Sequence, residues 1–351
     1  MPRLRLILLA LVIVVGLLWR PFLQPAGQGA LLILDLFAPV IGTNLTALVT
    51  PAPRVEETRE ALDGVETRVT WWRPGWGDSH AAVMMVNGAT AQGNDNPATR
   101  QLGVALARAG FLAMLPEFAF LKDGRFDVAA TRQLEAAFAR LRGRAENAGR
   151  SAGAFGASVG GAALLAGAGA EPMLRGADYV VVLGGYYDFD TYLASVVSWS
   201  QLRDGHVVAW MPSLEVRERL PPAAIAAAPA SDRESVRAAT VATSYDVALA
   251  RIRALPSGTR AVFDAHSPET VWAKIAPPIF WLHDPNDEFE PVAEAEVARA
   301  AAREGRFALI VPGLVQHAEV TAGAGARGPL YIAGELATLL GTVVEIMRLA
   351  R

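Results

Sequence analysis

The chain contains no cysteine among its 351 residues, so disulfides, thiolate metal sites and a cysteine nucleophile are all excluded. Charge is also sparse. Only 19% of the residues are charged and the formal net charge is −3, which leaves no basic excess of the kind that nucleic-acid-binding proteins carry. We therefore expect no nucleic-acid partner. Because 52% of the residues are hydrophobic, the chain needs either a large buried core or a membrane segment.

The amino terminus lacks an apolar run of full membrane-spanning length. Residues 6–19 are apolar and would form a helix of about 21 Å, short of the roughly 30 Å hydrocarbon core. Arg5 and Arg20 flank this run, and Trp19 could lie at the membrane interface. A second apolar run, residues 30–49, contains Asp35 and Pro39, which make a lipid-exposed span costly.

Three interpretations of this amino-terminal region, residues 1–50, stay open. It is a signal peptide cleaved near residue 26 or 30, an uncleaved anchor followed by an interfacial or core-packing segment, or a two-span hairpin. We favour the anchor. The basic residues before the span then place the amino terminus in the cytoplasm and the main domain outside it. The alternative location is secretion after signal cleavage.

Strand and helix patterns alternate along the rest of the chain. The first two strands flank Asp63-Gly64, a hairpin signal, and short apolar runs typical of buried parallel strands follow. We expect strands at 54–61, 65–72, 81–86, 111–115, 151–155, 179–183, 278–282 and 307–311. Helical patterns cover 97–109, 126–141, 162–168, 292–302 and 328–349. This alternation predicts an α/β fold with a mainly parallel central sheet and helices on both faces.

Residues 187–270 interrupt the alternation. The stretch is rich in Ala and Arg and is interpreted as several helices without a strand. Its position between two core strands predicts an inserted helical cap. The resulting division is a core first part at 51–186, the cap at 187–270, and a core second part at 271–351.

The most informative motif is Gly-x-Ser-x-Gly at residues 156–160, with Ser158 at its centre. An apolar run leads into it and an Ala/Leu-rich helical run leads out. A serine whose hydroxyl stands free at a sheet edge needs an unusual backbone turn, and side chains two residues before and after would collide there. Ser158 is therefore the candidate nucleophile.

A serine nucleophile needs a base, and the base needs an orienting acid. Asp287 follows the strand predicted at 278–282, and His317 follows the strand predicted at 307–311. Both therefore arrive at strand ends in the order Ser, acid, His. Asp284, Glu288 and Asp188 are the competing acids, and Asp188 is the main reserve because it follows the strand after the nucleophile.

These residues carry a resemblance to the α/β-hydrolase superfamily, over roughly residues 54–350, and to its dienelactone-hydrolase and esterase-like members. The resemblance implies a Ser158, Asp287 and His317 triad, and an oxyanion hole formed by the backbone N–H groups of Ala89 and Val159. Asn87 stands where members usually carry histidine, which puts the arrangement of the oxyanion loop in question.

The expected activity is that of a membrane-associated serine hydrolase that cleaves an ester, with a hydrophobic acyl group, through an acyl-enzyme. The alternatives are an acyltransferase, thioesterase or peptidase with the same triad, and a catalytically idle subunit of a membrane complex. We expect no cofactor and no metal. His283, Asp284, Asp287 and Glu290 fit an acid loop better than a metal site, and the remaining histidines are interpreted as structural or solvated, namely His80, His206 and His266.

Overall fold

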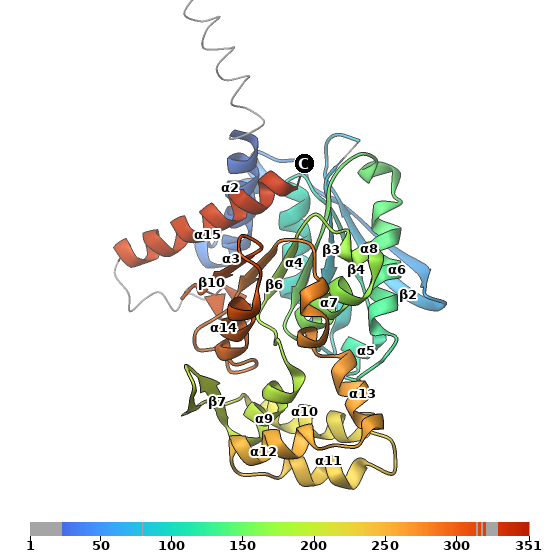
Figure 1. Ribbon diagram of the computed structural model, residues 1–351. Helices are drawn as coiled ribbons and strands as arrows, with labels where there is room; N and C mark the ends of the chain where they lie inside the picture. The colour runs from blue at the N-terminus through green and yellow to red at the C-terminus, as the bar shows by residue number, and fades with distance from the viewer. Residues whose placement is uncertain (1–22, 79, 314, 317–318, 321–328, 351) are drawn as a thin grey trace, which may run out of the picture.

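A mainly parallel sheet forms the centre of the molecule (Figure 1). The computed structural model describes residues 23–350, except 79, 314, 317–318 and 321–328. In this part of the chain eight strands lie in the order β1-β2-β4-β3-β5-β6-β9-β10. They are β1 (Arg54–Leu62), β2 (Val65–Arg73), β3 (Ala82–Val86), β4 (Leu112–Pro116), β5 (Ala152–Ala157), β6 (Val180–Leu183), β9 (Ile279–Leu282) and β10 (Phe307–Ile310). The ladders from β4 to β10 are parallel, and β2 is antiparallel to both β1 and β4, so the predicted sheet is confirmed.

The inner strands are buried because both faces of the sheet are covered. Every residue of β3 and β4 is buried, as expected for strands with helices on both sides. Alternate side chains divide between two cores. Met84 and Val182 pack with the helices of one face, and Val83 and Phe280 with those of the other.

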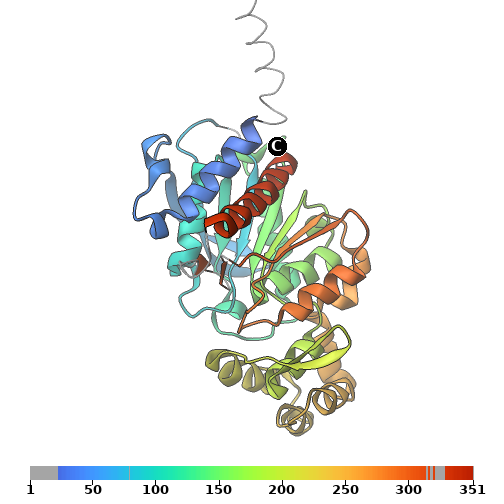
Figure 2. The same cartoon turned by 90° about the vertical axis from the view of Figure 1, so that its left-hand side faces the viewer.

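One face carries α6 (Ala130–Arg142), α7 (Val159–Ala170) and α14 (Val292–Ala301). The other carries α4 (Pro97–Arg108), α2 (Gln24–Leu36) and α15 (Pro329–Leu349), and Figure 2 shows α2 and α15 crossing in front of the sheet. Short helices complete the fold: α3 (Ala38–Ile41), α5 (Ala119–Lys122) and α8 (Pro172–Arg175). The expected helix at 126–141 begins later, at Ala130, because Asp127 forms a turn ahead of it and accepts a hydrogen bond from the Ala129 N–H at 2.8 Å.

The cap has its own core. It holds α9 (Phe189–Ser198), α10 (Leu214–Ala227), α11 (Arg233–Thr240), α12 (Tyr245–Arg253) and α13 (Ser257–Ala265), and it lies beneath the sheet in Figure 1. Its core is built around aromatic side chains such as Phe189 and Phe263, whose ring centroids lie 4.8 Å apart in an edge-on contact.

The expectation of a cap without strands is wrong. The hairpin of β7 (Ser200–Arg203) and β8 (His206–Ala209) turns at Asp204 and Gly205, which both have positive φ, 50° and 78°. Asp-Gly is the residue pair that this tight turn requires. The same pair at Asp63-Gly64 forms the hairpin of β1 and β2, as expected from the sequence.

The second apolar run packs into the core. Asp35, at its centre, is fully buried, accepts a hydrogen bond from the Thr46 hydroxyl at 2.5 Å, and lies 3.8 Å from the Arg108 guanidinium. Gln28, earlier in α2, donates to the Ala109 carbonyl at 2.9 Å. These contacts contradict the two-span interpretation and agree with a core-packing segment.

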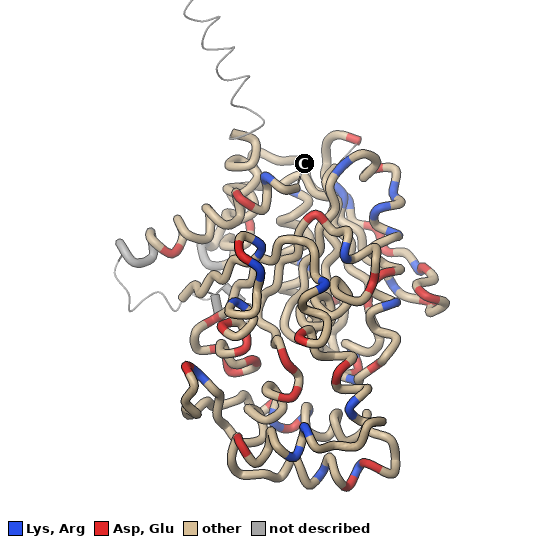
Figure 3. The backbone as a smooth tube through the Cα atoms, in the orientation of Figure 1, with Lys and Arg blue, Asp and Glu red and all other residues tan. Residues whose placement is uncertain are grey.

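No helix among the described residues is long and apolar enough to cross a bilayer. The first apolar run, residues 6–19, lies outside those residues. Asp35 is the one charged residue of α2, and the tube of this helix is almost entirely tan in Figure 3.

Candidate active site

Ser158 lies at a strained turn between β5 and α7. Its backbone has φ 53° and ψ −135°, a conformation that L residues rarely adopt and that functional sites often hold. The Ser158 N–H donates to the Leu183 carbonyl at 2.7 Å, which fixes the turn against β6. The sharp turn presents the hydroxyl at the carboxyl end of the sheet, the geometry of a nucleophile elbow.

The two glycines of the motif are required by close backbone contacts. A Cβ at Gly160 would lie 2.0 Å from the Asn87 carbonyl oxygen, and one at Gly156 would lie 2.7 Å from the Gly161 Cα. Both obstacles are backbone atoms, which cannot rotate away. The Gly-x-Ser-x-Gly spacing therefore follows from the packing of the turn.

We expect Gly160→Ala to lower the free energy of unfolding by about 1–3 kcal/mol or more, because the new methyl group forces the backbone at Asn87 to move. Chemical denaturation measures the change. Gly341→Ala in α15 is the matched control, since a Cβ there meets nothing within 4 Å and alanine favours a helix. Equal stability of the two variants would contradict the packing argument.

The loop after β3 is held in place by the side chain of Asn87. Its amide donates to the Gly93 carbonyl at 2.9 Å, and its oxygen accepts from the Thr99 hydroxyl at 2.6 Å. Both atoms of the Asn87 amide group therefore hold the loop in place, one bound to Gly93 and the other to Thr99.

The residues predicted to supply the oxyanion donors, Ala89 and Val159, line the cavity, and their role stays a prediction. Ala89 lies two residues after Asn87, and Val159 is the first residue of α7. Both line the same cavity as Ser158. An N–H in the first turn of a helix has no partner within the helix, so the Val159 N–H is available to a developing negative charge. Thr90 lines the cavity beside them, whereas the Gln92 side chain binds Asn96 on the exposed side of the loop.

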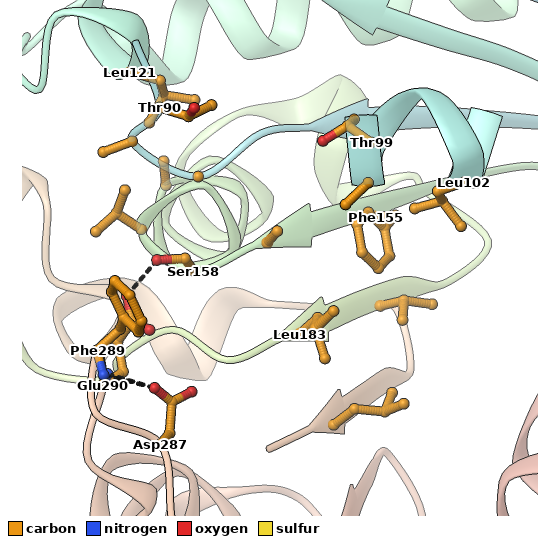
Figure 4. Close-up of a pocket in the computed structure, with 18 of the residues that line it drawn as sticks. Thr90, Thr99, Leu102, Leu121, Phe155, Ser158, Leu183, Asp287, Phe289 and Glu290 are labelled. Atoms are coloured by element: carbon orange, nitrogen blue, oxygen red, sulfur yellow. Dashed lines mark hydrogen bonds between the residues drawn. The ribbon is translucent and has the colours of Figure 1, made fainter. Parts of the chain in front are cut away.

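Asp287 is buried in the loop that follows β9. One carboxylate oxygen accepts hydrogen bonds from the backbone N–H groups of Phe289, at 2.7 Å, and Glu290, at 3.1 Å (Figure 4). The other oxygen lies 3.9 Å from His283 Nε2. Two backbone donors stabilise the ionised form of a carboxyl group, which is the form that an orienting acid needs.

His283 forms hydrogen bonds within the protein through both ring nitrogens. Its Nδ1 accepts a hydrogen bond from the indole N–H of Trp281 at 3.3 Å, so Nε2 carries the proton and donates to the Glu290 carbonyl at 3.0 Å. Asp284, nearby, accepts from the Asn286 N–H at 2.9 Å and so closes the turn after the strand. Neither residue contacts Ser158 in these bonds.

Glu290 is the site residue that the sequence reasoning missed. The Ser158 hydroxyl donates to Glu290 Oε1 at 2.5 Å, and Figure 4 shows the two side chains pointing toward one another. Glu290 is 1% exposed. The only signal was a fourth acid in the loop, after Asp284, Asp287 and Glu288 and directly before Pro291, and a carboxylate in an acidic loop is usually solvated.

The predicted base, His317, lies outside the described residues. It follows β11 (Val315–Gln316), and β12 (Glu319–Val320) pairs antiparallel with β11 just beyond it. Its role therefore stays a prediction.

The reserve acid Asp188 is placed elsewhere. Its carboxylate accepts from the Asp190 N–H at 2.9 Å and lies 3.8 Å from Arg253, in a small side cavity of about 300 Å³ that does not include Ser158. Burial, reinforced by Asp190, raises the pKa of Asp188 to about 6. This position argues against Asp188 as the orienting acid.

Glu294 lies beside Asp188 and is buried. It accepts hydrogen bonds from the N–H groups of Tyr187 and Asp188, both at 3.0 Å, and from the Thr191 hydroxyl at 2.6 Å. Burial, reinforced by the Asp188 charge, raises the pKa of Glu294 to about 7. Between pH 4.5 and 7 the folded state therefore binds more protons than the unfolded state.

We expect this group to lower stability by about 3 kcal/mol as pH rises from about 4.5 to 8, since a raised carboxyl pKa stabilises the fold only below that pKa. Urea unfolding across this range should show a smaller fall for Glu294→Gln than for the parent. Glu304→Gln, at an exposed site, should follow the parent. If the stability of Glu294→Gln changed with pH in the same way as that of the parent, the raised pKa of Glu294 would be contradicted.

The cap holds the acid loop through three successive backbone carbonyls. The Trp210 indole donates to the Asp287 carbonyl at 2.7 Å, the Ser213 N–H to the Glu288 carbonyl at 2.7 Å, and the Tyr192 hydroxyl to the Phe289 carbonyl at 3.0 Å. The next carbonyl, of Glu290, accepts from His283. The position of both site carboxylates therefore depends on the cap as well as on the sheet.

Ser158 opens into a cavity of about 920 Å³. One limb lies against the cap and is lined by Phe126, Val216, Arg219 and His266, among others. Burial lowers the pKa of His266, whose Nδ1 lies 2.8 Å from the Val262 carbonyl. The other limb runs between the sheet and α2, α4 and α15.

No family model matches the chain, and no curated protein matches its sequence. Solved structures match its fold. The 2,6-dihydroxy-pseudo-oxynicotine hydrolase superposes with a TM-score of 0.56 at 17% identity, over 86% of this chain and 71% of that one. Brefeldin A esterase, a bacterial homologue of human hormone sensitive lipase, gives 0.51 at 18% identity, over 92% and 86%.

A third match is the acylaminoacyl peptidase of Pyrococcus horikoshii, with a TM-score of 0.53 at 11% identity. It covers 86% of this chain and 43% of the peptidase. The strand order, the serine turn after β5 and these superpositions agree with the resemblance seen in the sequence, and the chain has the α/β-hydrolase fold.

Proposed function

We propose that the chain is a serine hydrolase that cleaves a carboxylic ester through an acyl-enzyme on Ser158. The observation that carries this proposal is the strained backbone of Ser158, which presents its hydroxyl to a 920 Å³ cavity beside the buried acid loop. A fold maintains such strain where chemistry requires it. The apolar lining of much of that cavity favours an ester of an apolar acid over a peptide.

In the proposed reaction His317 takes the Ser158 proton as the oxygen attacks the ester carbonyl. Asp287 holds the imidazole tautomer and stabilises the imidazolium. The Ala89 and Val159 N–H groups bind the oxyanion, and each such donor contributes about 3 kcal/mol to barrier lowering. The imidazolium then protonates the leaving alcohol. Water, activated by the same imidazole, releases the acid and restores Ser158.

Glu290 adds a carboxylate that this mechanism does not use as a base. In the resting state its Oε1 accepts a hydrogen bond from the Ser158 hydroxyl at 2.5 Å and so fixes the direction of the hydroxyl. We infer that Glu290 positions Ser158 before substrate binds, and that the hydroxyl turns from the carboxylate to the imidazole when the ester enters.

The test is labelling with a fluorophosphonate, which reacts with activated serines. The full-length chain should be labelled at Ser158, as mapped by peptide mass spectrometry. Absence of labelling in folded protein would favour the alternative, a catalytically idle hydrolase fold that serves as a subunit of a membrane complex. Acyl transfer and thioester cleavage share the same residues and are separated from ester hydrolysis by product analysis with the matching substrates.

We further propose that residues 6–19 tether the chain to a membrane, with the main domain outside the cytoplasm. Support comes from the flanking arginines and from α2, which packs on the core and so leaves the first run as the membrane segment. The full-length chain should fractionate with membranes, and a chain that starts at residue 23 should not. Truncation there keeps α2 intact. Equal fractionation of both chains would overturn the tether.

A further inference from the structure

Side chains in the middle of the sheet are less buried than their position predicts. Val180 and Val182 of β6 are fully buried on one face, whereas Val181 and Leu183 remain partly exposed on the other. Phe155 of β5 and Leu282 of β9 share that face and are also partly exposed. Central strands covered by helices normally bury both faces. The space between this face and α2 and α15 is therefore open.

This space is the second limb of the cavity that contains Ser158. Its walls are Phe155, Leu183, Leu102 of α4, Leu36 of α2, and Thr342 and Val343 of α15. Figure 4 shows Phe155, Leu183 and Leu102 leading away from Ser158 in one direction, and Glu290 and Asp287 lying in another, below Ser158. No described residue that lines this limb is charged. The charged residues that line the rest of the cavity belong to the cap limb and the acid loop.

We propose that this limb binds the unbranched alkyl chain of the acyl group, a deepening that rests on the proposed ester hydrolysis. The leaving alcohol must receive a proton from the base that Asp287 orients, so it lies on the acid-loop side of Ser158. The part of the ester that stays on the serine then points away from the acid loop, and the apolar limb that begins at Leu183 is open to it. Water in an apolar limb lacks polar partners, so a hydrocarbon chain is the favoured occupant.

The alkyl chain length of the acid is therefore the determinant of specificity. Each methylene that enters the limb leaves water and contributes about 0.8 kcal/mol, which is about fourfold in kcat/KM. Octanoate has four more methylenes than butyrate, so we expect kcat/KM for p-nitrophenyl octanoate to exceed that for p-nitrophenyl butyrate by roughly two-hundredfold, measured below the concentration at which the esters form micelles.

A pair of variants in α15 tests the location of the chain. Thr342 lines the limb and Thr338 does not, and each hydroxyl donates at 3.0 Å to the carbonyl four residues earlier. Thr342→Trp fills the limb and should lower the octanoate to butyrate ratio of kcat/KM at least tenfold. Thr338→Trp, one turn earlier in α15 at an exposed position that does not line the cavity, should leave the ratio unchanged. Leu102→Trp fills the limb from the opposite wall and should repeat the effect, which covers the case of a Thr342 variant that fails to fold.

A binding measurement separates this proposal from the proposed function. Titration calorimetry with sodium dodecanoate on Ser158→Ala should show binding that Thr342→Trp in the same background weakens at least tenfold. An enzyme that hydrolyses the butyrate ester but shows a flat chain-length profile, with dodecanoate binding unchanged by Thr342→Trp, overturns the alkyl-chain site alone. Loss of all hydrolysis and labelling, with dodecanoate still bound in the limb, overturns the ester hydrolase and leaves an alkyl-binding site.

Discussion

Ser158→Ala is expected to reduce kcat for ester hydrolysis by about 10⁵-fold or more, to the small residual rate that binding and oxyanion donors alone provide. The substitution removes the only atom of the side chain that can form the acyl-enzyme. It also removes the hydrogen bond to Glu290 and relieves no backbone strain, since alanine at φ 53° is strained as well. Folding should therefore persist while chemistry is lost.

The measurement is single-turnover release of p-nitrophenol, with fluorophosphonate labelling in parallel. Ser235→Ala, at an exposed position of α11, is the matched control and should retain full turnover and labelling. Turnover in Ser158→Ala above a thousandth of the parent rate would show that another residue carries the reaction.

Asp287→Asn is expected to lower kcat by about 10⁴-fold, because asparagine keeps the shape of the loop but presents the wrong partner to the imidazole. One Asp287 oxygen accepts hydrogen bonds from the Phe289 and Glu290 N–H groups, and the side-chain oxygen of asparagine can accept the same two bonds. The loop should therefore keep its conformation. Asp188→Asn should change kcat less than threefold, since Asp188 lies outside the cavity of Ser158.

Glu290→Gln separates positioning from proton transfer in the same assay. Glutamine keeps an acceptor for the Ser158 hydroxyl but not the charge, and the weaker hydrogen bond predicts a loss of about tenfold. A loss as large as that of Asp287→Asn would instead make Glu290 the proton acceptor. A large loss in Asp188→Asn, with Asp287→Asn active, would overturn the assignment of the acid.

Local patterns made most of the fold predictable. Apolar runs such as 81–86 and 111–115 can be buried only between two layers of helices, and the Gly-x-Ser-x-Gly spacing follows from backbone contacts within one turn. The cap hairpin was missed although Asp204-Gly205 carries the same turn chemistry as Asp63-Gly64. The Ala-rich and Arg-rich surroundings suggested helix and outweighed that pair.

Features that join distant residues could not be predicted. The contact between Ser158 and Glu290 spans 132 positions and depends on the path of the acid loop, which the cap holds. The sequence likewise gave no means of placing α2 and α15 against the sheet at a distance that leaves an open limb. Packing of two helices on a sheet depends on side chains from all of them together.

Three hydrogen bonds join the cap to the acid loop, so a movement of the cap is coupled to the position of Asp287, the proposed orienting acid. A cap that swings open to admit substrate must either carry residues 287–289 with it or release them. In both cases Asp287 leaves its resting position while the site is open to water. We expect the enzyme to be inactive while the cap is open and to become active when the cap closes. Hydrolysis would then be confined to an ester that is fully enclosed.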